Sequence, residues 1–327
     1  MNSTIEIGSA KADPGSISEG SILVEKLAGG GEISMPVTII NGISDGPCFW
    51  INGGIHGDEP EGILTCSLLK KVIDPKKLSG CIVLIPVINV PAMEAAERGN
   101  PLDTFSYDMN RIYPGREEGY LSERIAHVHK EWMVKYADME ISIHSGGSHS
   151  YLAEAMFAAT DEKTQELARA MGEDWKVCLY SNVTSKSPMA VMSEMGRPAL
   201  TVELGGRSST APGKFLEVGE KILKACVNIL VHYKMIEGEA HYPSIRYKGY
   251  QQALLAPKSG VFLPNKNIKF LSMMKKNDFI AAIIDYQGNE LCQLTAPADG
   301  MIFGLRALPN VTVGDWCCFY AIIEGEW

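Results

Sequence analysis

The chain contains 327 residues, of which 46% are hydrophobic and 21% charged, and such values exclude a disordered, collagen-like or coiled-coil protein. The 30 Lys and Arg residues against 39 Asp and Glu residues give a formal net charge of −9. Because an acidic protein repels phosphate backbones, we expect no nucleic-acid partner. The polar start of the chain lacks the pattern of an export signal, and the longest apolar stretch, residues 81–93, is too interrupted to span a bilayer. We therefore expect a cytoplasmic protein with no membrane partner.

Residues 37–235 alternate strand-like and helix-like segments. Leu121, Ile125 and Val128 recur at the spacing of an amphipathic helix, whereas residues 81–88 form the continuous apolar run of a buried strand. The expected helices cover 61–72, 121–132 and 215–233, and the expected strands cover 48–52, 81–88, 139–143, 153–158 and 198–204. Strands that alternate with helices indicate an α/β domain with a mostly parallel or mixed sheet.

The character of the sequence changes after about residue 240. No helical stripe remains, and short apolar runs alternate with Gly, Pro and Asn, which predicts an all-β region. The motif A-P-x-x-G occurs there twice, at 256–260 and 296–300, and indicates two similar β motifs. We therefore expect an α/β domain over residues 1–240, with 1–36 as a leading segment, followed by a small β domain over 241–327.

The most informative segment is I-N-G-G-I-H-G-D-E-P-E-G, residues 51–62, where an expected strand runs into a glycine turn. His56 and Glu59 lie three residues apart at the expected start of a helix, and one helical turn places such positions on one face. An imidazole and a carboxylate placed in this way can share a cation, and zinc suits that mixture of ligands. Spacing alone does not distinguish Glu59 from Asp58 or Glu61 as the ligand.

A catalytic zinc site requires a third protein ligand and leaves one position for water. His144 ends an expected strand in the string I-S-I-H-S-G-G, and strand ends are where α/β sheets place their sites. An isolated H-x-x-E occurs by chance, and a single His after a strand is usually a polar loop residue. The flanking glycines and the second His favour a metal site. The motifs H-E-x-x-H, G-x-S-x-G and G-x-x-x-x-G-K-[ST] do not occur in the sequence.

Five motifs stand in order along the chain: G-I-H-G-D-E at 54–59, Arg98, D-M-N-R-I-Y-P-G at 108–115, H-S-G-G at 144–147 and T-V-E-L-G-G at 201–206. Together they resemble the succinylglutamate desuccinylase/aspartoacylase family, which shares the fold and site of zinc carboxypeptidases. The resemblance covers roughly residues 37–235, and the repeat-containing tail resembles the small β domain that these proteins carry. It implies a zinc-carboxypeptidase-like mixed sheet flanked by helices, with a small C-terminal all-β domain.

The resemblance implies one zinc ion per chain, held by His56, Glu59 and His144. Asp108 matches the acid that orients the first zinc histidine by accepting the proton on its outer nitrogen. Zinc in such a site lowers the pKa of water and so supplies a nucleophile near neutral pH.

Four further residues match the groups that act on the substrate. Glu203 matches the general base, which takes a proton from water and returns it to the leaving amine. Arg98 matches the arginine that polarises the scissile carbonyl. Asn110 and Arg111 match the pair that holds the substrate's carboxylate, for which a guanidinium offers a planar fork with two bonds. Taken singly, each residue fits an ordinary salt bridge or a partnered buried acid, but five agreeing motifs favour the functional interpretation.

One position departs from the family pattern. Most desuccinylase-like members carry Asp two residues before the third ligand, where this chain has Ser142. Digestive carboxypeptidases carry a similar I-S-I-H-S string, so the departure bears on the choice between acylase and peptidase rather than on zinc. Our leading hypothesis is a zinc-dependent amide hydrolase that removes an acyl group from a small-molecule N-acyl amino acid or a similar small amine. The alternatives are a carboxypeptidase that trims a C-terminal residue and a non-catalytic small-molecule binding protein, and the sequence also permits a homo-oligomer.

Overall fold

The computed structural model describes residues 3–104, 108–180, 186–207 and 211–326, and its framework is a 12-stranded mixed sheet. The strands are β1 Ile5–Ile7, β2 Ala10–Ala12, β3 Ser16–Lys26, β4 Glu32–Asn41, β5 Ser44–Asn52, β6 Ser79–Ile85, β7 Met139–His144, β8 Ser150–Ala158, β9 Val177–Tyr180, β10 Ala199–Gly206, β11 Tyr247–Leu255, β12 Gly260–Pro264, β13 Met273–Met274, β14 Phe279–Ile284, β15 Glu290–Thr295, β16 Gly300–Arg306, β17 Asn310–Val311 and β18 Trp316–Glu326. The helices are α1 Glu61–Val72, α2 Val90–Ala95, α3 Leu121–Tyr136, α4 Glu162–Ala170, α5 Pro188–Glu194 and α6 Lys214–His232, with short 3-10 helices η1 Pro75–Lys77 and η2 Met109–Arg111. No helix in the described part of the chain combines the length and apolar composition needed to cross a bilayer.

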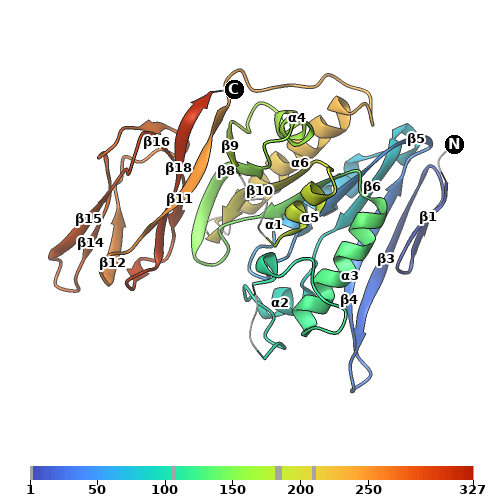
Figure 1. Ribbon diagram of the computed structural model, residues 1–327, viewed down its shortest axis with the longest axis horizontal. Helices are drawn as coiled ribbons and strands as arrows, with labels where there is room; N and C mark the ends of the chain where they lie inside the picture. The colour runs from blue at the N-terminus through green and yellow to red at the C-terminus, as the bar shows by residue number, and fades with distance from the viewer. Residues whose placement is uncertain (1–2, 105–107, 181–185, 208–210, 327) are drawn as a thin grey trace.

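Helices cover both faces of the central strands, as Figure 1 shows. Alternate residues of β5 divide between the two sides: Phe49 and Ile51 pack in the core with α1, α4 and α6, whereas Trp50 packs with α3 and α5. Burial on both faces explains the nearly continuous apolar sequence of these strands. The parallel pairs β5–β6, β5–β7 and β10–β7 bring their carboxyl ends to one edge of the sheet, where α/β proteins place their sites.

The predicted mixed α/β architecture with C-terminal strands is confirmed, and the details differ in two places. Residues 1–36, expected only as a leading segment, contain β1, β2 and β3, and β3 pairs with β4 at the sheet edge. Most residues of β3 are exposed or half-buried, so its apolar pattern is weak. The strand expected at 81–88 ends at Ile85, because Pro86 has no N–H to donate to a neighbouring strand.

The described residues after 240 form strands and no helix. Four of these strands extend the central sheet: β11 pairs parallel with β9, and β18, β16 and β13 follow in antiparallel pairs. The others form a four-stranded sheet in the order β15-β14-β12-β17. Phe303 and Ala321 share one buried cluster with Leu152 and Val177, so the C-terminal strands pack directly against β8 and β9.

The two A-P-x-x-G repeats have the same local structure. Each begins directly after a strand and ends at the first residue of the next strand, between β11 and β12 and between β15 and β16. The two repeats therefore form the same kind of connection between strands, although β12 lies in the four-stranded sheet and β16 in the central sheet.

Candidate active site

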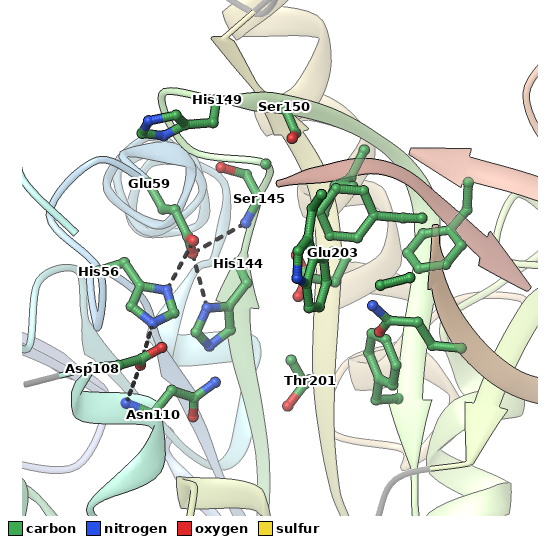
Figure 2. Close-up of a pocket in the computed structure, with 18 of the residues that line it drawn as sticks. His56, Glu59, Asp108, Asn110, His144, Ser145, His149, Ser150, Thr201 and Glu203 are labelled. Atoms are coloured by element: carbon green, nitrogen blue, oxygen red, sulfur yellow. Dashed lines mark hydrogen bonds and ion pairs between the residues drawn. The ribbon is translucent and has the colours of Figure 1, made fainter. Parts of the chain in front are cut away.

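A cavity of about 940 Å³ lies at the carboxyl ends of β5, β7 and β10, and all eight site residues predicted from the sequence line it. Figure 2 shows His56, Glu59 and His144 on one side of this cavity, with Glu203 on the neighbouring strand. Side chains from β11, β16 and β18 complete the wall. The C-terminal strands therefore form one wall of the cavity, a relationship that the sequence left open.

His56 and Glu59 lie in the turn between β5 and α1, just before the helix that they were expected to start. The N–H of Glu59 donates to the carbonyl oxygen of His56 at 3.3 Å. Gly57 is required in this turn, because a Cβ at that position would lie 2.0 Å from the backbone of Ala92. The spacing of three residues still brings the two side chains together, although the turn is not helical.

The three predicted metal ligands form one buried group. Glu59 lies between the two imidazoles: its Oε1 is 2.8 Å from Nδ1 of His56, and its Oε2 is 2.9 Å from Nδ1 of His144. Each of the three residues is 2% exposed, and their ligand atoms lie within 4.8 Å of one another. Two imidazole nitrogens and one carboxylate are a donor set that zinc binds in catalytic sites.

Burial and mutual attraction compete within this group. Burial would lower the pKa of His56, but Glu59 and Asp108 outweigh it and raise the pKa to about 9. For His144, burial prevails and lowers the pKa despite the same carboxylate. Burial would raise the pKa of Glu59, but the two histidines hold it well below its usual range. The group therefore contains an ionised carboxylate and one imidazole that stays neutral near neutral pH.

The structure distinguishes Glu59 from its two acidic neighbours. Asp58 Oδ2 accepts hydrogen bonds from the N–H and the hydroxyl of Ser148. Glu61 Oε1 accepts from the N–H of Gly206 at 2.8 Å, and burial raises the pKa of Glu61 to about 7. Of these three acids, Glu59 is the one whose carboxylate contacts both histidines.

A carboxylate holds the outer nitrogen of His56. Nε2 lies 2.9 Å from Asp108 Oδ1, so it carries a proton and Nδ1 faces Glu59. The guanidinium of Arg98 joins the same two acids, donating to Glu59 Oε1 at 3.2 Å and to Asp108 Oδ2 at 3.1 Å. Although burial opposes it, contact with His56 and Arg98 holds the pKa of Asp108 well below its usual range. Asp108 therefore lies at the position expected of an orienting acid.

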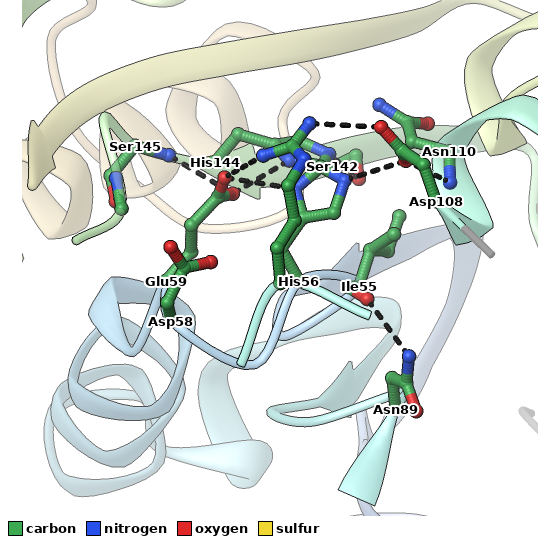
Figure 3. A network of polar contacts seen from close by, with 12 residues as sticks. Ile55, His56, Asp58, Glu59, Asn89, Asp108, Asn110, Ser142, His144 and Ser145 are labelled. Carbon is green, nitrogen blue, oxygen red and sulfur yellow. Dashed lines mark hydrogen bonds and ion pairs between the residues drawn. The ribbon is translucent and has the colours of Figure 1, made fainter. Parts of the chain in front are cut away.

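A chain of buried groups holds the outer nitrogen of His144. Its Nε2 is 3.2 Å from Ser142 Oγ, a contact visible in Figure 3. The Ser142 hydroxyl donates to Asn52 Oδ1 at 2.9 Å, and Asn52 Nδ2 donates to Glu140 Oε1 at 2.6 Å. Because a hydroxyl has one proton, Ser142 can only accept from His144. His144 therefore carries its proton on Nε2 and directs the lone pair of Nδ1 at Glu59.

This arrangement of acceptors fits a metal ion. Nδ1 of His144 and the ionised carboxylate of Glu59 lie 2.9 Å apart, a spacing that a proton or a metal cation shared by the two atoms can bridge. Nε2 of His56 donates to Asp108, and Nδ1 of the same ring is directed at the Glu59 carboxylate. The donor set and its orientation therefore suit zinc.

Glu203 lies on β10 beside His144. The two residues are register partners on parallel strands, so their side chains leave the same face of the sheet. Burial, and after it the charge of Glu59, raises the pKa of Glu203 well above its usual range. Its Oε2 has no hydrogen-bond partner among the described residues. A buried carboxyl group with an unpaired oxygen beside a cavity is suited to proton transfer.

Asn110 and Arg111 lie on η2, directly after Asp108. The Asp108 carboxylate accepts from the N–H of Asn110 at 2.9 Å, so one turn carries both the support of His56 and the predicted carboxylate clamp. Arg111 is exposed and lines the cavity, and one of its N–H groups donates to the carbonyl of Asn110. Its other guanidinium donors make no hydrogen bond to the described residues, which leaves the fork available to an anion.

Sequence analysis missed Asn52 and Glu140. Asn52 ends β5 directly after its four buried residues, Glu140 is the second residue of the fully buried strand β7, and both side chains are 0% exposed. A charged residue in the middle of M-E-I-S-I-H is the signal that marks Glu140, since buried polar groups require partners. Which partner it has depends on the pairing of β5 with β7, which the sequence does not specify.

The chain belongs to the succinylglutamate desuccinylase/aspartoacylase family, whose catalytic-domain model matches residues 45–230. Over 300 residues it is 25% identical to the N-alpha-acetyl-L-2,4-diaminobutyric acid deacetylase of Halomonas elongata, a match that covers 87% of this chain and 84% of that protein.

Two solved structures share the fold over nearly the whole chain. One is a succinylglutamate desuccinylase from Silicibacter sp. TM1040, with a TM-score of 0.82 at 20% identity, covering 98% of this chain and 100% of that one. The other is the product-bound ectoine utilization protein EutE (DoeB) from Ruegeria pomeroyi, with a TM-score of 0.82 at 21% identity, covering 99% of this chain and 100% of that one. The common fold therefore includes the C-terminal strands as well as the α/β part.

Proposed function

We propose that this protein is a zinc-dependent hydrolase that removes the acyl group from an N-acyl amino acid or a similar small amine. The observation that carries the proposal is the buried group of His56, Glu59 and His144, with both imidazoles oriented toward one carboxylate and Glu203 on the adjoining strand. The relative from Halomonas elongata is named as the deacetylase of an acetylated diamino acid, which supports the same class of reaction.

Nδ1 of His56, a carboxylate oxygen of Glu59 and Nδ1 of His144 would hold one zinc ion per chain. Zinc, when bound, polarises an amide carbonyl and makes water nucleophilic near neutral pH. Asp108 and Ser142 keep the two rings turned so that their Nδ1 atoms stay available.

Glu203 acts as the general base and then as the general acid. It takes a proton from water as the water oxygen forms a bond to the acyl carbon, and the unpaired Oε2 is suited to hold that proton. It returns the proton to the amide nitrogen as the C–N bond breaks, so the products are a carboxylic acid and a free amine. Arg98 uses two guanidinium contacts on Glu59 and Asp108, and its remaining donors stabilise the charge that develops on the carbonyl oxygen.

Arg111 and Asn110 bind the carboxylate of the amino acid. A carboxylate accepts two parallel bonds from a guanidinium, and an ammonium cannot reproduce that geometry. In an N-acyl amino acid this carboxylate is attached to the carbon that also bears the amide nitrogen. Binding it at η2 therefore directs the scissile amide toward the His56 group and Glu203.

The wall that the C-terminal strands add to the cavity favours an acylated amino acid over a peptide. Strands β11, β16 and β18 wall the side of the cavity away from the metal group, whereas a carboxypeptidase needs an open path for the chain before the scissile bond. The third alternative, a binding protein without turnover, would be favoured by the loss of a proposed metal ligand or of the proposed base, whereas His56, Glu59, His144 and Glu203 all line the cavity.

The test is hydrolysis of a panel of N-acyl amino acids by the zinc-loaded protein, with the release of free amine as the readout. We expect turnover that disappears on zinc removal and returns on zinc addition. Derivatives amidated at the carboxyl group should react poorly because Arg111 has no anion to bind. Release of C-terminal residues from peptides with no turnover of N-acyl amino acids would show the carboxypeptidase alternative to be correct.

A further inference from the structure

The cavity continues past Glu203 on the side away from the metal group. In the sheet, β10 lies between β7, which carries His144, and β8. Phe157 of β8 is the register partner of Thr201, which also lines the cavity two residues before Glu203. Side chains two residues apart on a strand share a face. The metal group and Phe157 therefore lie on opposite sides of Glu203.

A row of four aromatic rings starts at Phe157 and lines this second half of the cavity. The ring centroid of Phe157 lies 6.3 Å from that of Phe303, which lies 6.0 Å from that of Phe319, and Phe319 lies 5.0 Å from Trp316. Phe303 is 1% exposed and Trp316 is 44% exposed. The row thus extends from buried Phe303 to exposed Trp316, and the edge-to-face contacts of Phe303 with Phe157 and Phe319 favour rigid rings.

Gly304 makes room for this row. It is the register partner of Phe319 on the adjacent strand. A Cβ on Gly304 would lie 2.1 Å from a side-chain carbon of Leu152 and 3.1 Å from the ring of Phe319. A larger residue would therefore displace the ring that connects Phe303 to Trp316.

The same half of the cavity has no uncommitted positive charge among its described C-terminal residues. Arg306 is the one charged residue that β11, β16 and β18 contribute to the lining. Its guanidinium is 3.2 Å from Asp315 and donates to the carbonyl oxygens of Leu308 and Asn310. A carboxylate at the end of an acyl chain would therefore lose its hydration here without gaining a free cation.

We infer that this row is the acyl-binding subsite and that it selects an uncharged aromatic acyl group; the inference rests on the proposed function. With the amino-acid carboxylate at Arg111 and the amide at Glu203, the acyl group extends toward Phe157. Flat apolar rings in a fixed row bury an aromatic acyl group over a large area. A hydrophobic pocket discriminates against smaller groups by roughly 10-fold or more for each missing carbon, and an acetyl group leaves most of the row uncovered.

The test compares kcat/KM for N-acetyl-, N-hexanoyl-, N-succinyl- and N-benzoyl-alanine on the zinc-loaded protein. We expect N-benzoyl-alanine to exceed N-acetyl-alanine by about 10-fold or more, with N-succinyl-alanine the poorest. A preference for the acetyl or succinyl derivative would overturn the inference.

Two variants locate the preference in the row. Phe319→Leu and Trp316→Ala should each lower the ratio of kcat/KM for N-benzoyl-alanine to kcat/KM for N-acetyl-alanine by about 5- to 10-fold, because the benzoyl group covers more of the row than the acetyl group does. Phe279→Leu and Tyr286→Ala are the matched controls, because both residues are exposed aromatics of the C-terminal region outside the cavity lining. A ratio that changes in the controls as much as in the row variants would contradict the assignment.

Binding separates this inference from the proposed function. If none of the four derivatives is hydrolysed, the proposed reaction is wrong. Isothermal titration calorimetry with the same compounds then still tests whether the aromatic row binds the acyl group. Tighter binding of N-benzoyl-alanine than of N-acetyl-alanine, with the difference lost in Phe319→Leu, would support the subsite. Equal affinities would overturn it.

Discussion

The two histidines of the site are oriented by supports of opposite physical character. His56 contacts Asp108, an acid whose side chain is 28% exposed and ion-paired with Arg98. His144 contacts Ser142, which is linked by hydrogen bonds to the fully buried side chains of Asn52 and Glu140. Both supports fix the proton on Nε2 and turn Nδ1 toward Glu59, so one geometric requirement is met by a charge in one case and by hydrogen-bond direction in the other.

The difference shows how Ser142, which carries no charge, can still orient a histidine. Asn52 on the neighbouring strand accepts a hydrogen bond from the Ser142 hydroxyl, so Ser142 acts as the acceptor in its contact with His144. Burial raises the pKa of Glu140 to about 8, so the end of this chain is uncharged near neutral pH. A partly exposed charged support is screened by salt more than a neutral buried one. The two supports therefore predict different responses to mutation and to ionic strength.

The largest effect is expected for Asp108→Asn. The substitution keeps the size of the side chain but removes the charge that favours the Nε2 proton of His56 and pairs with Arg98. Loss of such a partner typically weakens metal binding by about 10–100-fold. Competition with a chromophoric chelator measures the zinc affinity, and the deficit should shrink at high salt, because salt already weakens the exposed pair in the unmodified protein. A deficit that is independent of salt would show that the charge of Asp108 is not what matters.

A smaller effect is expected for Ser142→Ala. Without the hydroxyl, the N–H of His144 is buried with no acceptor, which should lower zinc affinity by about 10-fold at every salt concentration. Thr65→Val is the matched control, since it removes another buried hydroxyl, which donates to the backbone of Glu61. Equal zinc affinities in the two variants would exclude a role for Ser142 in orienting His144.

The smallest effect on zinc is expected for Glu140→Gln, within about 2-fold, because a glutamine oxygen still accepts from Asn52. Stability should respond instead. A carboxyl whose pKa is about 8 when folded and about 4.3 when unfolded binds an extra proton in the folded state between those values. The contribution of Glu140 to the free energy of unfolding therefore falls as pH rises, by about 1.4 kcal/mol per pH unit. Glutamine does not titrate, so the variant should not show this decrease. Urea unfolding of both zinc-free proteins at pH 5 and pH 8 measures the difference, and identical pH dependence would contradict a neutral Glu140.

The contrast between the supports also separates what the sequence predicts from what it does not. The strands and long helices follow from apolar periodicity, and Asp108 follows from a motif in which it is two residues from the predicted clamp at Asn110. The support of His144 joins Asn52 to residues 88 and 90 positions away through strand pairing, and no local pattern encodes that register. The aromatic wall is hidden for the same reason, since Phe157 meets Phe303 only where β16 pairs with β8.

Both supports serve a reaction whose central step we assign to Glu203, and Glu203→Gln tests that assignment most directly. The glutamine preserves shape but cannot accept the proton of water, and Glu203 is not among the proposed ligands. We expect bound zinc and KM to stay near the values of the unmodified protein while kcat falls by about 10²–10⁴-fold. Zinc content, KM and kcat are measured on one preparation. A kcat close to that of the unmodified protein, or loss of the zinc, would contradict the account.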